Sequence, residues 1–136
     1  MKSSWFRVSV VLAALTAALP VAAHHSLAMF DLTKTVTVKG TVTEFRWMNP
    51  HVALLVKVDP QPGTSPQVWS IELTSPNNLT RGGWTKRTFK PGDRIELVFN
   101  PLRDGRHGGV FDKATILATG QVISSDRRIS EKPGLQ

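Results

Sequence analysis

Four histidines are the side chains of this chain best suited to bind a metal ion. His24 and His25 are adjacent, whereas His51 and His107 each lie in a turn marked by proline or glycine. The adjacent pair directly follows a segment with the features of a secretory signal peptide. Cleavage after Ala23 would make His24 the first residue, with a free α-amino group beside its imidazole. The sequence therefore predicts a nitrogen-rich metal site that exists only after processing.

Residues 1–23 have the three parts of a signal peptide. Lys2 and Arg7 give a positive start, residues 8–19 are almost entirely apolar, and Pro20 is followed by three small residues. The apolar stretch is shorter than the roughly 20 residues that span a bilayer. We expect cleavage after Ala23, a periplasmic protein and no transmembrane span after processing. An uncleaved N-terminal anchor is the alternative, and a lipid anchor is excluded because the chain has no cysteine.

Copper is the metal that this nitrogen set suits best. The α-amino group and ring of His24, with His51 as third ligand, would form a T-shaped set that matches the tetragonal preference of Cu(II). His25 or His107 could assist or exchange the ion. Cleavage after Ala22 would instead place His25 third, where it could bind Cu(II) or Ni(II) together with backbone amides. The opposing interpretation is that these histidines are solvated or stabilise turns.

Composition limits the kind of protein and partner. Removal of 23 of the 136 residues leaves 113, enough for one small domain. Without Lys2 and Arg7, 15 Lys and Arg stand against 10 Asp and Glu, a net charge of +5. An exported protein rarely meets nucleic acid, so we expect a transition-metal ion or an envelope component as the partner. Without cysteine, apolar burial and a hydrogen-bonded sheet must supply the stability.

Alternating apolar residues predict five β-strands. The first is long, and a slip in its alternation near Thr43 or Glu44 indicates a β-bulge. Turns rich in proline, glycine and asparagine separate the strands. The alternating segments are residues 36–47, 52–58, 69–73, 95–99 and 110–118.

A short helix is expected between the third and fourth strands. Ser75 can cap it, Pro76 suits its first position and Gly82 can end it. This order predicts an all-β fold, a five-stranded OB-like, partly open Greek-key barrel, with a β-sandwich as the rival. We expect the barrel in residues 24–120 and a polar, flexible tail in residues 121–136.

The OB-like order brings two loops to one binding face. These loops join strands one and two and strands four and five, so His51 and His107 could be neighbours. Arg46, Trp47, Arg103 and Arg106 would lie near the same loops and could cradle an anionic or sugar-like ligand. In the alternative interpretation the tryptophans pack the barrel and the arginines are solvated.

Several short motifs along the chain resemble a family of small exported bacterial proteins classed as a domain of unknown function. The resemblance covers roughly the whole mature domain and implies export and a compact β fold, without an established activity. His107 is not part of the shared pattern. The motifs are Ala23–Ser26, Phe30–Asp31, Gly40–Val42, Trp47–His51, Ser75–Asn77, Arg81–Trp84, Lys90–Asp93 and Arg103–Gly105.

No catalytic residues are assigned. The carboxylates are scattered at spacings that define no acid and base pair, and the glycines form no phosphate-binding loop. The sequence therefore favours an exported binding module with copper as its leading ligand. The alternatives are a metal-free module that binds a protein or anionic envelope ligand through the Arg/Trp face, and a copper-dependent redox enzyme.

Overall fold

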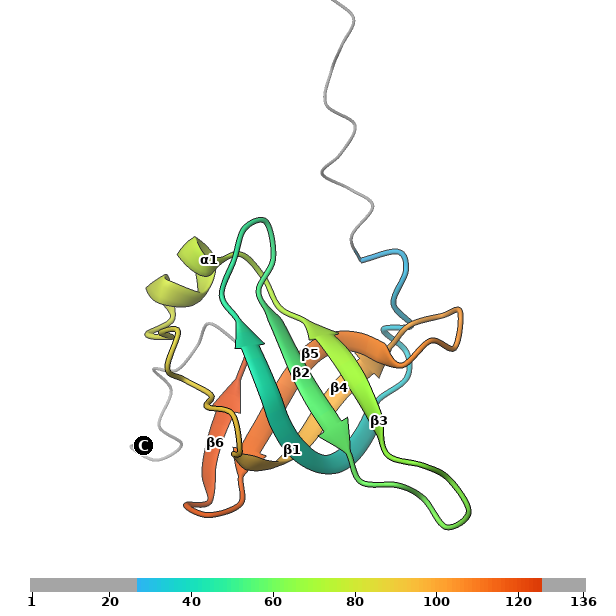
Figure 1. The fold of residues 1–136 in the computed structure, drawn as a ribbon. Helices are drawn as coiled ribbons and strands as arrows, with labels where there is room; N and C mark the ends of the chain where they lie inside the picture. Colours follow the sequence, from blue (N-terminus) through green and yellow to red (C-terminus); the bar gives the residue numbers. More distant parts are fainter. Residues whose placement is uncertain (1–26, 126–136) are drawn as a thin grey trace, which may run out of the picture.

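The structure, a computed structural model, describes residues 27–125 (Figure 1). The expected signal peptide, His24, His25 and residues 126–136 lie outside the described residues. Within them, one helix and six strands follow one another along the chain. Their bounds are β1 Val36–Arg46, β2 Ala53–Val58, β3 Gln67–Glu72, α1 Pro76–Arg81, β4 Arg94–Pro101, β5 Gly108–Ile116 and β6 Gln121–Ser124.

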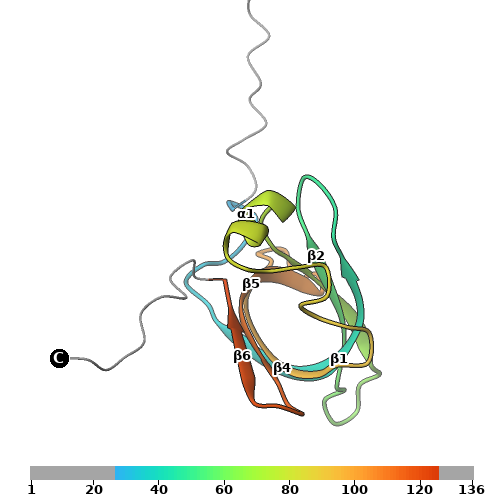
Figure 2. The same ribbon diagram turned by 90° about the vertical axis from the view of Figure 1, so that its left-hand side faces the viewer.

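The first five strands form a closed barrel. The strands are hydrogen-bonded in the order β3-β2-β1-β4-β5-β6, and a further parallel pairing joins β3 to β5. Figure 2 looks toward the ring that these strands make. The pairing order and the helix between β3 and β4 are those of an OB-like barrel, which confirms the fold expected from the sequence. The β3–β5 pairing closes a barrel that we expected to be partly open.

The long first strand, β1, pairs with two neighbouring strands. Its first half pairs with β4, and its second half pairs with β2. The register with β2 shifts between Val42 and Glu44, at the bulge that the broken alternation predicts. A bulge bends a strand and increases its twist, which lets β1 curve around the barrel.

Alternation along each strand directs one set of apolar side chains into the barrel. Leu54, Ile71, Ile95 and Phe99 are completely buried. Trp84, Phe89 and Phe111 are also buried, and their rings meet edge to face. This apolar interior is the main source of stability for a chain without disulfides.

The helix has the caps that its sequence predicts. The Ser75 side chain accepts a hydrogen bond from the backbone N–H of Asn78, Pro76 occupies the start and Gly82 is the C-cap. Leu79 is the helix residue that packs into the core. None of the described residues belongs to a helix that is long and apolar enough to cross a membrane.

The expected tail boundary at residue 121 is wrong. Gln121–Ser124 form β6, which pairs antiparallel with Lys113–Ile116 at the edge of the sheet. Only Val122 and Ile123 are apolar in this segment, and Ile123 packs against the core. Pairing with β5 rather than any local pattern makes this segment a strand.

The first described residues are fastened to the loop between β4 and β5. Phe30 is buried and forms a β-bridge with Leu102. The backbone N–H of Arg103 donates to the carbonyl of Met29 (2.9 Å), and the N–H of Asp31 donates to the carbonyl of Pro101 (2.8 Å). Residues 29–31 are therefore held against the barrel.

We predict that Gly109→Ala destabilises the barrel by about 1–3 kcal/mol, the usual cost of overpacking. A Cβ at residue 109 would lie 2.3 Å from the backbone oxygen of Asn100 and 2.4 Å from the Phe99 ring. Urea denaturation would measure the change. Gly82→Ala is the matched control, because its Cβ would come no closer than 3.3 Å to any neighbour and its φ of −85° suits alanine. Equal stability of the two variants would contradict the prediction.

Candidate metal centre and pocket

His51 stands at the end of the β1–β2 loop, just before β2. The next residue, Val52, is fully buried and exchanges backbone hydrogen bonds with Leu73 and Thr74 beyond the end of β3. Ala53 is paired with Glu72 in the β2–β3 register. The sheet thus places the imidazole of His51 beside the carboxylate of Glu72, with 2.9 Å between Nδ1 and Oε1.

The contact with Glu72 leaves the other ring nitrogen of His51 available. A neutral imidazole that donates from Nδ1–H to a carboxylate carries its lone pair on Nε2. Metal-binding histidines in proteins commonly have this carboxylate partner, which fixes the tautomer and the ring orientation. The side chain of His51 is 40% exposed, so the ring is partly open to solvent.

His107 has different surroundings. Its ring stacks on Trp69, with 5.0 Å between ring centroids and 15° between planes. Trp69 and Glu72 are three residues apart on β3, a spacing that corresponds to about 10 Å and to opposite faces of the strand. We therefore do not place His51 and His107 in one site. The described residues contain no group of three or more His, Cys, Asp or Glu that could hold a metal ion.

The N-terminal segment lies against the β4–β5 loop (Figure 1). Val36 at the start of β1 pairs with Phe99 near the end of β4, whereas the β1–β2 loop follows the other end of β1. Arg103 also donates from Nε to the carbonyl of Ala28 (3.1 Å), which ties the chain close to residue 27. Two methionines, Met29 and Met48, belong to these segments and are 41% and 51% exposed.

The three arginines expected to cradle an anion are each paired with a carboxylate. Arg46 makes two hydrogen bonds to Glu44 (3.0 and 2.7 Å), and these lower the pKa of Glu44. Arg106 contacts Asp104 at 2.7 Å, and Arg103 lies 3.9 Å from Asp31.

Trp47 is half-buried and packs edge to face on Phe45, with 5.7 Å between ring centroids. Its ring is thus engaged in packing rather than presented as an open platform. With the arginines also engaged, the Arg/Trp face is less able to bind an anion than the sequence suggests.

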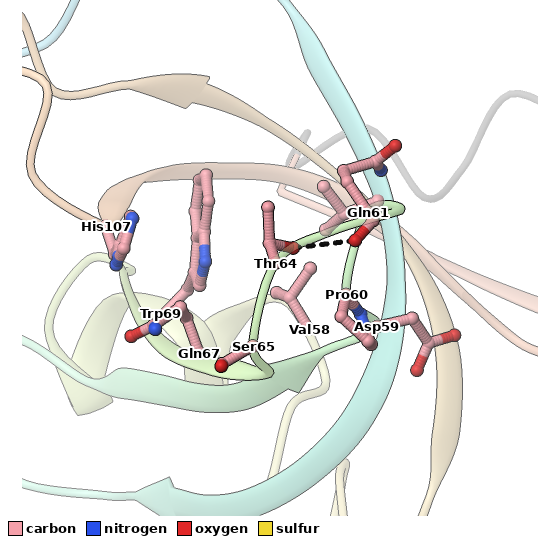
Figure 3. Close-up of a pocket in the computed structure, with 10 residues that line it drawn as sticks. Val58, Asp59, Pro60, Gln61, Thr64, Ser65, Gln67, Trp69 and His107 are labelled. Carbon is pink, nitrogen blue, oxygen red and sulfur yellow. Dashed lines mark hydrogen bonds between the residues drawn. The ribbon is translucent and has the colours of Figure 1, made fainter.

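A pocket that sequence reasoning missed lies beside Trp69 and His107. It has a volume of about 440 Å³ and lies between β3 and the loop that joins β2 to β3 (Figure 3). Eight of its ten lining residues lie within residues 58–69, but Val38 and His107 come from distant parts of the chain, so no local motif marks it. The lining residues are Val38, Val58, Asp59, Pro60, Gln61, Thr64, Ser65, Gln67, Trp69 and His107.

One ion pair fastens the start of the β2–β3 loop to β4. Arg94 donates two hydrogen bonds to Asp59 (2.8 and 2.7 Å) and a third to Thr41 (3.1 Å). The hydrogen bonds from Arg94 hold the pKa of Asp59 below its usual value. The Asp59 carboxylate is therefore already engaged at the edge of the pocket.

The lowered pKa of Asp59 predicts a pH-dependent contribution to stability. This contribution is present above the unfolded-state pKa near 3.9 and is lost as the pH falls through the lower folded-state pKa. We expect Asp59→Asn to lower Tm slightly at pH 7 and to have less effect near pH 2, because the pair is exposed and screened. Thermal melts at both pH values would measure this. Asp112→Asn is the control, and an equal effect of both variants at pH 7 would contradict the prediction.

Comparison with known proteins supports the resemblance seen in the sequence motifs. The model of a family of unknown function (DUF6152) matches residues 11–112, most of the chain. No curated protein and no solved structure gives a significant match. The matched segment includes the Asn-Pro-His turn and β1 to β4, and it reaches into β5. The chain belongs to this family of unknown function.

Proposed function

We propose that this protein is an exported, periplasmic copper-binding module with an OB-like barrel. Its copper ligands would be Nε2 of His51 and the α-amino and ring nitrogens of His24 after cleavage behind Ala23. The observation that carries the proposal is the 2.9 Å contact between Nδ1 of His51 and the carboxylate of Glu72. That contact prepares an imidazole for metal binding through its remaining nitrogen.

Chain length limits how far His24 can lie from the described chain. His24 precedes Leu27 by three residues, so its Cα lies within about 11 Å of the Cα of Leu27. Residues 28–31 are hydrogen-bonded to the β4–β5 loop and to β4. The anchored segment thus limits where an N-terminal amino group could go.

The donor types favour copper over harder metals. Three nitrogens in a T-shape suit Cu(II), and nitrogen sites generally bind copper more tightly than nickel or zinc. The exposed thioethers of Met29 and Met48 belong to the same two segments and are ligands suited to Cu(I). We therefore propose a module that binds copper, without a catalytic role for any residue.

The metal-free alternative is less well supported. It requires Arg46, Arg103 and Arg106 to be free for an anionic ligand, but each arginine has a carboxylate partner. A protein or envelope ligand would have to displace these pairs. The His51 imidazole needs no such rearrangement to accept a metal.

A Cu(II) titration followed by electron paramagnetic resonance would test the proposal. The protein must be exported and processed in cells, and mass spectrometry must establish that its first residue is His24. We expect one tight site with nitrogen hyperfine structure, lost in His24→Ala and His51→Ala. His107→Ala is the matched control, because His107 stacks on Trp69 away from Glu72. Weak binding that is indifferent to His24 and His51 would refute the proposal.

We further predict that Glu72→Gln weakens Cu(II) binding about 10- to 100-fold, the usual effect of losing a partner of a metal-binding histidine. Glutamine keeps the size of the side chain and an oxygen acceptor, but it lacks the charge that increases the basicity of the imidazole. Competition with a Cu(II) chelator would measure the affinity. Glu96→Gln, a carboxylate of β4 that lies 3.9 Å from Lys39, is the control. Unchanged affinity in Glu72→Gln would show that Glu72 does not tune the site.

A further inference from the structure

We propose that the pocket beside Trp69 binds a neutral sugar ring. The pocket has a volume of about 440 Å³, within the range of roughly 300–1,000 Å³ that small-molecule sites occupy. It lies at the far end of β2 from His51, next to Val58. The inference is therefore independent of the proposed copper site.

Trp69 offers the pocket a fixed aromatic face. One side of its indole stacks on His107, and its edge meets Phe99 with 5.4 Å between ring centroids. Figure 3 shows the indole between His107 on one side and Thr64 on the other. The side that faces Thr64 is thus a flat apolar wall whose orientation is set before any ligand arrives.

The opposite wall is a loop with preformed structure. Pro60 and Pro62 restrict the backbone, and Gly63 adopts a positive φ of 82° in the turn. The backbone N–H and the hydroxyl of Thr64 both donate to the carbonyl of Gln61 (3.0 and 2.9 Å). A ligand that enters would therefore order little of the loop, which lowers the cost of binding.

The polar groups of the pocket are mostly neutral. Gln61, Gln67, Thr64 and Ser65 carry amides and hydroxyls that can donate and accept hydrogen bonds. The carboxylate of Asp59 is engaged by Arg94. These groups therefore offer no free charged partner to an anion or to a cation.

A sugar ring matches this combination of surfaces. One face of a pyranose is lined by C–H groups that can lie against an indole, and its rim carries hydroxyls that both donate and accept. The indole of Trp69 matches the C–H face of the sugar, and the amides and hydroxyls of the pocket match the sugar hydroxyls. A flat aromatic compound would use the indole but would make no use of the amides and hydroxyls.

A nuclear magnetic resonance titration of ¹⁵N-labelled protein would test the proposal. The probes are the neutral trisaccharides maltotriose, cellotriose and chitotriose, with indole as the flat aromatic comparison. We expect at least one trisaccharide to give saturable shifts of the Trp69 indole N–H and of residues 60–67. Indole should give no saturable shifts at these positions.

Substitutions at exposed positions separate ligand contacts from folding. Gln67→Ala and Ser65→Ala should each weaken trisaccharide binding about fivefold, the effect of losing one net hydrogen bond. Trp69→Phe should weaken it further through the smaller ring. Gln121→Ala on β6 is the control and should bind as the unsubstituted protein does.

Three results would overturn the proposal. The first is the absence of saturable shifts with all three trisaccharides, and the second is saturable binding of indole alone. The third is trisaccharide binding that is unchanged in both Gln67→Ala and Ser65→Ala. Since Cu(II) is absent from these titrations, the outcome does not depend on the copper proposal.

Discussion

Closure of the barrel by the parallel pairing of β3 with β5 is the constraint on which the rest of the structure depends. Ser70, Ile71 and Glu72 pair with residues 108–110, and the two strands approach closely because residue 108 is glycine. A Cβ at Gly108 would lie 2.7 Å from the backbone oxygen of Ser70. Any side chain there would push the strands apart and open the barrel.

This closure places β3 between two neighbouring strands, β2 and β5. The backbone oxygen of His107 accepts a hydrogen bond from Ser70, which holds His107 where it can stack on Trp69. Glu72, three residues after Trp69, contacts His51, which lies just before the other neighbouring strand, β2. One short strand thus positions a carboxylate and imidazole pair and, separately, an aromatic wall, and the pleat keeps the two apart.

Four arginines near the candidate sites lie in local ion pairs with carboxylates. The chain carries a formal net charge of +7, yet Arg46, Arg94, Arg103 and Arg106 all lie beside carboxylates. Such exposed pairs contribute little to stability, but they reduce the attraction of this surface for anions. Among the described residues, the positions of side chains therefore indicate candidate ligand sites better than the net charge does.

Local patterns in the sequence determined most of the elements. Alternation of apolar residues specifies the five barrel strands, and the break in that alternation marks the bulge after Val42. Ser75 and Pro76 mark the start of the helix. These features can be predicted because each depends on residues that are neighbours in the chain. Tertiary structure alone decided that Glu72 meets His51, that Trp69 stacks on His107, and that Gln121–Ser124 form a strand. These contacts depend on the register between strands distant in sequence, which no local periodicity encodes.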